Sequence, residues 1–208
     1  MEISGIILAG GRSSRMGSNK ALLPLAGAPL IERLTKELEA AVGHIVIAGG
    51  NHNVYGHLGA EVVPDIFPGK GPLSGIHAGM SASPALWSLV VACDMPFADL
   101  RVFRRLTELA IEAEAKQSEE RIEAVVPHIE GRIHPLLAMY RHSALSALSK
   151  ELAHGHLKVT KWVESLRVKY VDGLLLSANT GISTEMLQFN MNIPDDYLYA
   201  KVKLNSPD

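Results

Sequence analysis

Apolar residues along the chain form two alternating patterns: short unbroken runs, and longer stretches in which they recur every three or four positions. The unbroken runs predict buried strands at 3–9, 44–48, 60–63, 86–93 and 123–128, with a later strand at 167–171. The helical spacing predicts helices at 29–42, from about Leu73 onward, and at 99–117, 143–152 and 157–166. The segment 134–140 is compatible with a strand that pairs with the fifth one, and 173–188 carries no readable pattern.

The alternation of strands and helices indicates the fold class. Strands that read as solid apolar runs are buried on both faces, so helices must cover both faces of a parallel sheet. We therefore expect an α/β fold with three layers around a mostly parallel sheet. A chain of 208 residues without an internal repeat, low-complexity tract or linker further predicts one domain over 1–208.

Composition limits the partners and the compartment. With 20 basic and 22 acidic side chains, the chain has no overall field that would attract nucleic acid or an anionic membrane. Its single cysteine excludes an intramolecular disulfide framework, and its start lacks the basic and apolar regions of an export signal. The apolar runs are shorter than the roughly 20 residues that span a bilayer. We expect a cytoplasmic protein without membrane or nucleic-acid contacts.

The stretch LAGGRSSRMGSNK at 8–20 directly follows the first predicted strand. Its cations are Arg12, Arg15 and Lys20, and no Asp or Glu occurs between Glu2 and Glu32. The glycine spacing fits neither a dinucleotide fingerprint nor a Walker loop. The glycines at 10 and 11 still allow backbone N–H groups to approach a phosphate, and the cations favour a polyphosphate. The alternative is a solvated loop with ordinary surface cations.

Two carboxylates follow predicted strands, where ligands of open α/β sheets bind. Asp65 comes after the third strand, and Asp94 follows the strand that ends in Cys93. Hard cations such as Mg²⁺ prefer oxygen ligands and often link one or two carboxylates to substrate phosphates, and we take Asp94 as the metal ligand. Each aspartate alone is equally compatible with a helix cap or a turn.

A second glycine-rich segment, GKGPLSG at 69–75, precedes a helix. Pro72 fixes the backbone there, whereas Gly71 and Gly75 leave room for a nucleobase or ribose. A plain helix entry with proline near the first turn explains the same residues. No His-x-x-x-His pair or Cys–His spacing indicates zinc, and Cys93 fits a small core residue better than a nucleophile.

Five segments in a fixed order carry a resemblance. They are LAGGRSSRMGSNKALL at 8–23, GPLSGI at 71–76, CDMPF at 93–97, HPLLAMY at 134–140 and NMNIPDD at 190–196. Together they resemble the molybdenum cofactor guanylyltransferase family. The first segment is shared with other nucleotidyltransferases, including sugar-phosphate and molybdopterin cytidylyltransferases, and the combination is typical of the guanylyl branch.

The resemblance implies a Rossmann-like nucleotidyltransferase fold that transfers GMP from GTP to the terminal phosphate of molybdopterin, with Mg²⁺ and release of pyrophosphate. It implies catalytic roles for Arg15, Lys20 and Asp94, with Asp94 as the magnesium ligand. The GTP-binding positions that it implies are Leu8, Ala9, Gly10, Gly11, Lys20, Asp65, Gly71 and Asp94. Those that it implies for the second substrate are His134, Asn190 and Asn192. Other molybdenum cofactor biosynthesis proteins and molybdoenzyme apoproteins are the protein partners that it implies.

The chain departs from the family pattern at three places. Asn19 stands where an aspartate is frequent, and Ile193 stands where a threonine usually follows the second asparagine. The segment 48–51, Ala-Gly-Gly-Asn, lies where some members carry an asparagine beside the base. This last difference bears on the choice of guanine.

Three other functions compete with this hypothesis. A nucleotidyltransferase for another base or acceptor, such as a molybdopterin cytidylyltransferase, would differ in base preference. A nonenzymatic module that carries nucleotide or molybdopterin would bind GTP without producing pyrophosphate. A nicotinamide dehydrogenase would bind NAD(P), but the chain lacks the glycine fingerprint of that class.

Overall fold

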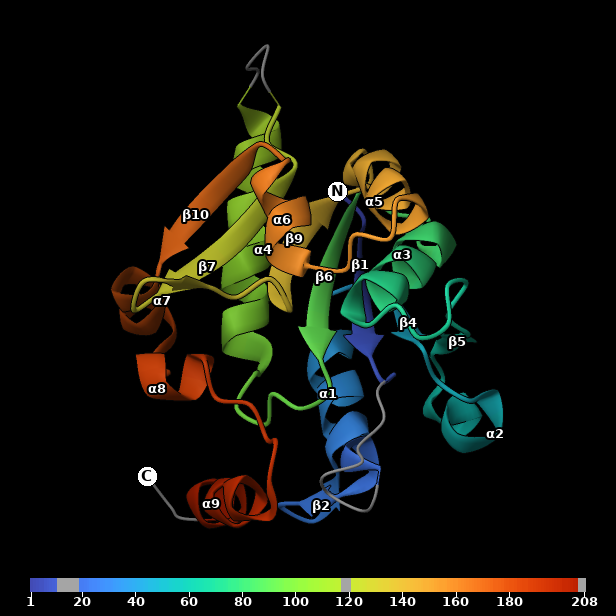
Figure 1. Cartoon of the computed structure of the whole chain (residues 1–208). Helices are drawn as coiled ribbons and strands as arrows, with labels where there is room; N and C mark the ends of the chain where they lie inside the picture. The colour runs from blue at the N-terminus through green and yellow to red at the C-terminus, as the bar shows by residue number, and fades with distance from the viewer. Residues whose placement is uncertain (11–18, 117–120, 206–208) are drawn as a thin grey trace.

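A mixed sheet of eight strands forms the middle layer of the computed structural model, which describes residues 1–10, 19–116 and 121–205 (Figure 1). Across the sheet the order is β10-β7-β9-β6-β1-β4-β5, and β8 pairs with β7. The strands are β1 (Ile3–Leu8), β4 (His44–Ala48), β5 (Glu61–Val63), β6 (Trp87–Ala92), β7 (Ala124–Ile129), β8 (Arg132–Ile133), β9 (Leu137–Arg141) and β10 (Val168–Asp172). A separate hairpin joins β2 (Pro24–Leu25) and β3 (Ala28–Pro29).

The pairing is mostly parallel, as the sequence predicts. Strand β1 pairs in parallel with β4 and β6, β4 with β5, and β7 with β10. Strand β9 is antiparallel to both of its neighbours, β6 and β7, which confirms that 134–140 contributes a strand beside the fifth predicted one. Because β9 runs in the opposite direction, it begins at the edge where the parallel strands end. There the Leu136 carbonyl accepts a hydrogen bond from Ala92 N at 2.9 Å.

Helices cover both faces of the sheet, and each face has its own apolar core. Along β1, Ile3 and Ile7 join the core under the first and fourth helices, whereas Ile6 and Leu8 join the core under the third and fifth. The helices are α1 (Leu30–Glu39), α2 (His52–Tyr55), α3 (Pro72–Ala82), α4 (Leu100–Ala115), α5 (Ala144–Ala153), α6 (Val159–Glu164), α7 (Gly173–Thr180), α8 (Thr184–Leu187) and α9 (Pro194–Asn205). Short 3₁₀ turns occur at η1 (Lys20–Leu22) and η2 (Gly56–Leu58). The three-layer α/β fold is therefore confirmed.

Helix α3 packs close to β1. A Cβ atom at Gly79 would overlap the Ile6 side chain, and one at Gly75 would lie 3.1 Å from Leu8 Cδ2. These two glycines are four residues apart and therefore occupy the same face of the helix. Their small size lets the N-terminal end of α3 lie directly over the end of β1.

Segment 173–188, which the apolar pattern left unassigned, contains α7 and α8. In helix α7 the first residue, Gly173, is followed by three consecutive leucines, of which Leu174 and Leu175 are exposed, so no helical period is visible. The helix is instead started by Asp172, whose carboxylate accepts hydrogen bonds from the amides of Leu174 at 2.9 Å and Leu175 at 3.0 Å. Throughout the described residues, no helix is long and apolar enough to cross a membrane.

Candidate active site

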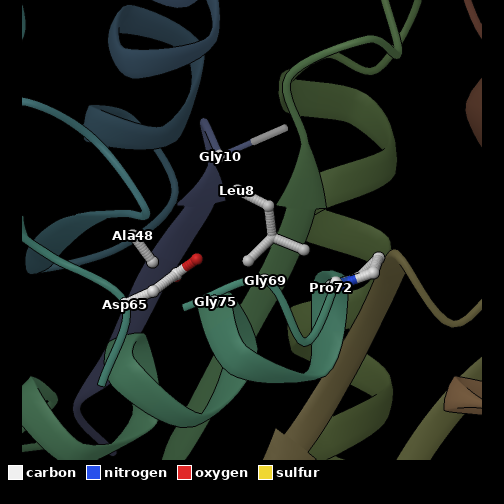
Figure 2. Close-up of a pocket in the computed structure, with 8 residues that line it drawn as sticks. Leu8, Gly10, Ala48, Asp65, Gly69, Pro72 and Gly75 are labelled. Atoms are coloured by element: carbon white, nitrogen blue, oxygen red, sulfur yellow. The ribbon is translucent and has the colours of Figure 1, made fainter. Parts of the chain in front are cut away.

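A pocket of about 830 Å³ opens at the carboxyl ends of β1, β4 and β5, beside the first turn of α3 (Figure 2). Its lining comprises Leu8, Gly10, Ala48, Asp65, Gly69, Gly71, Pro72 and Gly75. This is the edge at which open α/β sheets bind ligands. The sequence predicted Leu8, Gly10, Asp65 and Gly71 as nucleotide contacts, and the structure brings all four to one cavity.

One wall of the pocket depends on a close approach of two loops. Gly49 has φ of 73°, and a Cβ atom there would lie 2.9 Å from Gly10 Cα and 3.1 Å from Asp65 Oδ1. Backbone hydrogen bonds hold this arrangement, from Gly49 N to Val63 O at 3.0 Å and from Ala9 N to Ala48 O at 2.9 Å. Ala9 thus fixes the loop through its backbone.

Asp65 is the acidic group of the pocket. Figure 2 shows its carboxylate projecting into the cavity beside Ala48. Its Oδ1 atom is buried and has no hydrogen-bond partner among the described residues, and burial raises the pKa of the carboxyl group. Because an unpaired buried acceptor is costly, this oxygen is suited to accept a hydrogen bond from a ligand hydroxyl or N–H group.

A charged cluster at the end of β6 surrounds Lys20. The Lys20 ammonium donates hydrogen bonds to the Met191 carbonyl and to Asn192 Oδ1, the latter at 3.2 Å. It also lies 3.8 Å from Asp94 Oδ2. The Lys20 side chain is 14% exposed, so most of its stem is packed away from solvent. The structure thus joins three predicted site residues that are as far as 172 positions apart in the sequence.

Asp94 links this cluster to the sheet. Met191 N donates a hydrogen bond to Asp94 O at 2.8 Å, which attaches the segment before α9 to the end of β6. Burial raises the pKa of the Asp94 carboxyl group, and the nearby Lys20 ammonium partly opposes that shift. No group of three or more His, Cys, Asp or Glu side chains is arranged to hold a metal within 1–10, 19–116 and 121–205.

The other predicted residues occupy different positions. Asn190 Nδ2 donates to Gln188 O at 3.0 Å, so Asn190 stabilises its own loop while Asn192 contacts Lys20. Gly71 has φ of 68° and precedes Pro72, the first residue of α3. Gly11 and Arg15 lie outside the described residues.

His134 lies just before β9, at the same edge of the sheet as Asp94. Its backbone N–H donates to Pro127 O at 2.9 Å, while its buried Nε2 atom has no hydrogen-bond partner in the part of the chain that the structure describes. Burial, with a smaller contribution from the Arg132 charge, lowers the pKa of the imidazole. The lowered pKa favours the neutral imidazole, whose Nε2 atom no described residue binds.

Sequence reasoning did not single out three residues that contact Asn19, Lys20 or Asn192. They are Tyr55, Met191 and Asp196. Asn19 Nδ2 donates to the Tyr55 hydroxyl at 2.7 Å, which attaches the start of η1 to α2. The Tyr55 ring also lies against Gly50, where a Cβ atom would be 2.8 Å from the ring. Neither a lone tyrosine nor a methionine carbonyl has a motif that marks it in a sequence.

Cys93 is confirmed as a packed residue, because it is partly buried against the core under α1 and α4. Burial raises the pKa of its thiol to about 12. The thiol is therefore protonated at neutral pH, which excludes it as a ready nucleophile.

A doubly covered α/β sheet, a glycine-lined pocket at its carboxyl edge and an adjacent Lys–Asp pair together define a nucleotide-binding protein of the nucleotidyltransferase type. The sequence from residue 5 to 169 matches the model of the MobA-like NTP transferase domain. The chain belongs to this family, and the resemblance found in its motifs is confirmed.

Individual relatives cover almost the whole chain. The chain is 36% identical over 202 residues to a probable molybdenum cofactor guanylyltransferase of Pelotomaculum thermopropionicum, covering 97% of this chain and 93% of the relative. A protein of the same description from Clostridium perfringens is 35% identical, with 93% of each chain covered. Among solved structures, molybdopterin-guanine dinucleotide biosynthesis protein A of Archaeoglobus fulgidus superposes with a TM-score of 0.80. It is 27% identical, and the match covers 96% of this chain and 97% of that one.

We predict that Gly49→Ala forces apart the loops at Gly10 and Asp65, because the added Cβ atom has no room between them. Alanine at a positive φ costs about 1–2 kcal/mol, and overpacking against backbone adds about 1–3 kcal/mol. The free energy of unfolding should fall by the sum of both terms, as measured by denaturant unfolding, and nucleotide affinity should fall with it.

Gly59→Ala is the matched control for this prediction, because Gly59 has a similar φ of 72° but open space around its missing Cβ. It should show only the first cost and normal nucleotide affinity. Equal losses of stability in the two variants would contradict the close approach.

Proposed function

We propose that the chain is a molybdenum cofactor guanylyltransferase, which transfers GMP from GTP to the terminal phosphate of molybdopterin and releases pyrophosphate. The observation that carries this proposal is the Lys20–Asp94–Asn192 cluster beside a glycine-lined pocket at one sheet edge. The relatives of the chain support the same activity, because they are named as probable molybdenum cofactor guanylyltransferases and the similarity covers nearly their full length.

The two parts of the site suit the two ends of a nucleoside triphosphate. The pocket is lined by glycines and small apolar residues and contains one carboxylate, Asp65, which suits a base and ribose with their N–H and O–H donors. The Lys20 ammonium suits the negative charge of the phosphates. Leu8 and Gly10 line the pocket and belong to the same family motif as Ala9 and Lys20, so a bound triphosphate would extend from the pocket toward the Lys20 ammonium.

Lys20 would contribute to catalysis by stabilising the charge that develops on the pyrophosphate leaving group. We assign the same role to Arg15 and a backbone contact to Gly11, on the basis of their positions in the family motif. The transfer is a direct displacement in which the acceptor phosphate oxygen bonds to the α-phosphorus as the bond to pyrophosphate breaks. It requires no covalent intermediate with the protein.

Asp94 would hold a divalent cation, which we take to be Mg²⁺. A single carboxylate at the end of β6 fits this ion, because Mg²⁺ is commonly bound through one or two carboxylates together with substrate phosphates and water. When bound, the cation would neutralise phosphate charge. Before a cation binds, the Lys20 ammonium, 3.8 Å from Asp94 Oδ2, would keep the carboxylate oriented.

The acceptor molybdopterin would lie toward β9 and the segment before α9. His134 offers an unpaired ring nitrogen there, and Asn192 and Asn190 lie in the segment that borders Lys20. These groups can hydrogen-bond a pterin or its phosphate.

The choice of guanine does not depend on a side chain at 49. Gly49 has no room for one, so selection would rely on Asp65 and backbone groups of the pocket. A carboxylate accepts hydrogen bonds only, and the N1–H and exocyclic amino group of guanine offer two adjacent donors, whereas cytosine offers one donor group.

Calorimetric titration with GTP, CTP, ATP and UTP, each with and without Mg²⁺, tests this proposal. We expect Mg²⁺-dependent binding with a clear preference for GTP, followed by pyrophosphate release when molybdopterin is added. Preference for CTP would assign the chain to a cytidylyl activity. GTP binding without pyrophosphate release would indicate a nonenzymatic carrier, and no nucleotide binding would refute the proposal.

We predict that Lys20→Ala and Asp94→Ala each lower the rate of GMP transfer by about a hundredfold or more, because each removes charge stabilisation from the transition state. Steady-state pyrophosphate release measures the effect, and circular dichroism checks the fold. Lys36→Ala, which changes an exposed lysine of α1, should retain the normal rate. Near-normal transfer by a folded Asp94→Ala variant would remove Asp94 from the proposed cation site.

We also predict a pH dependence that links these two residues. The raised pKa of Asp94 means that the carboxylate is fully ionised only above a pH higher than usual for an aspartate, so Mg²⁺–GTP affinity should fall as the pH drops through that pKa. Since the Lys20 ammonium holds this pKa down, Lys20→Met should move the acid limb of affinity to higher pH. Titrations across a pH series measure the shift, and an unchanged acid limb would contradict the coupling.

A further inference from the structure

Asp196, in the first turn of α9, binds the backbone of segment 191–193, which contacts Lys20. Its Oδ2 atom accepts hydrogen bonds from two consecutive backbone amides, Asn192 N at 2.6 Å and Ile193 N at 3.0 Å. Asp196 N in turn donates to Ile193 O at 3.1 Å. One carboxylate oxygen therefore fixes the backbone of the two residues that precede α9.

The same short segment provides two acceptors for the Lys20 ammonium. They are the Met191 carbonyl and Asn192 Oδ1. Asn192 thus takes part in two hydrogen bonds at once, with its backbone held by Asp196 and its side chain held to Lys20. A displacement of the Asn192 backbone would carry the acceptor for Lys20 with it.

Helix α9 is firmly attached, so Asp196 has a fixed frame on which to act. The Tyr197 hydroxyl donates to Pro24 O at 2.8 Å, and Ala200 is fully buried. The Tyr199 ring lies 5.1 Å from that of Phe189 and 6.4 Å from that of Phe97, between centroids. These contacts tie α9 to the loop after β6 as well as to the β2–β3 hairpin.

The neighbouring carboxylate makes none of these bonds. Asp195 is exposed, and its side chain accepts no hydrogen bond from the described residues. The two adjacent aspartates have the same charge and lie in the same helical turn, so any effect of α9 electrostatics applies to both. Only Asp196 is connected to Asn192.

We propose that Asp196 is a positioning residue for Lys20, which it orients through Asn192 and Met191, so that α9 sets the geometry of the phosphate-binding lysine. The inference rests on the proposed function, in which Lys20 binds the triphosphate. A lysine has a long and flexible stem, and holding its ammonium in place before the nucleotide arrives reduces the ordering that binding requires.

The test is a double-mutant cycle on GMP transfer and Mg²⁺–GTP affinity with Asp196→Ala, Lys20→Ala and the double variant. Asp196→Ala should lower the transfer rate by about tenfold to a hundredfold, because small misplacements of catalytic groups carry losses of that order. In the Lys20→Ala background the same change should have less than about a threefold effect, because the group on which Asp196 acts is gone. Asp196→Asn, which retains an acceptor oxygen, should recover part of the rate, and Asp195→Ala should leave it unchanged.

A purely structural helix cap would give a different result. The losses from Asp196→Ala and Lys20→Ala would then multiply, and an equal loss in both backgrounds would overturn the proposal. A loss in Asp195→Ala as large as that in Asp196→Ala would also overturn it. If Asp196→Ala does not fold, as judged by circular dichroism, the cycle is measured with Asp196→Asn.

Amide hydrogen exchange without nucleotide provides a readout that does not depend on the reaction. Asp196→Ala should accelerate exchange at Asn192 and Ile193, and also at Met191, whose amide binds the Asp94 carbonyl. Asp195→Ala should not. If the wild-type protein neither binds GTP nor transfers GMP, the proposed function fails, while unchanged exchange in Asp196→Ala refutes the positioning role by itself.

Discussion

The contact of the Lys20 ammonium with the end of β6 and the segment before α9 is the interaction on which the site depends. Lys20 begins η1, Asp94 follows the central strand β6, and Met191 and Asn192 precede α9. A charged amine can leave water only when acceptors replace its hydration. The burial of most of the Lys20 stem therefore requires that all three segments meet, which couples the charged half of the site to completion of the fold.

The other half of the site depends on the absence of side chains. Gly49, Gly75 and Gly79 let two loops and a helix approach the end of β1 more closely than residues with a Cβ atom would allow. Among the described residues that line the resulting pocket, Asp65 is the charged one. Because Leu8 faces the core under α3 and Met191 faces the core under α1 and α4, the glycine-lined pocket and the Lys20 cluster meet at the sheet edge from opposite faces.

Apolar patterning predicted most of the sheet because its strands are solid runs, such as Ile3–Leu8, for which burial alone decides the conformation. It failed at α7, whose start depends on one hydrogen-bonding side chain, Asp172, and whose leucines show no period. The candidate site, too, could be predicted only in part from the sequence. Glycine and aspartate at strand ends could be read from local sequence. In contrast, the two groups of Met191 and Asn192 that Lys20 contacts are more than 170 residues away, and one of them is a backbone carbonyl, which no residue type encodes.

The reversed strand β9 explains how the site reaches beyond the parallel strands. A parallel strand between β6 and β7 would begin at the far edge of the sheet, away from the pocket. Because β9 is antiparallel, its start and the preceding His134 lie at the edge where β6 ends, and Leu136 bonds directly to Ala92. The buried ring nitrogen of His134 is thereby placed on the same edge as Asp94. One change of strand direction therefore brings a polar group to the edge that carries Asp94, without disturbing the parallel strands beside the pocket.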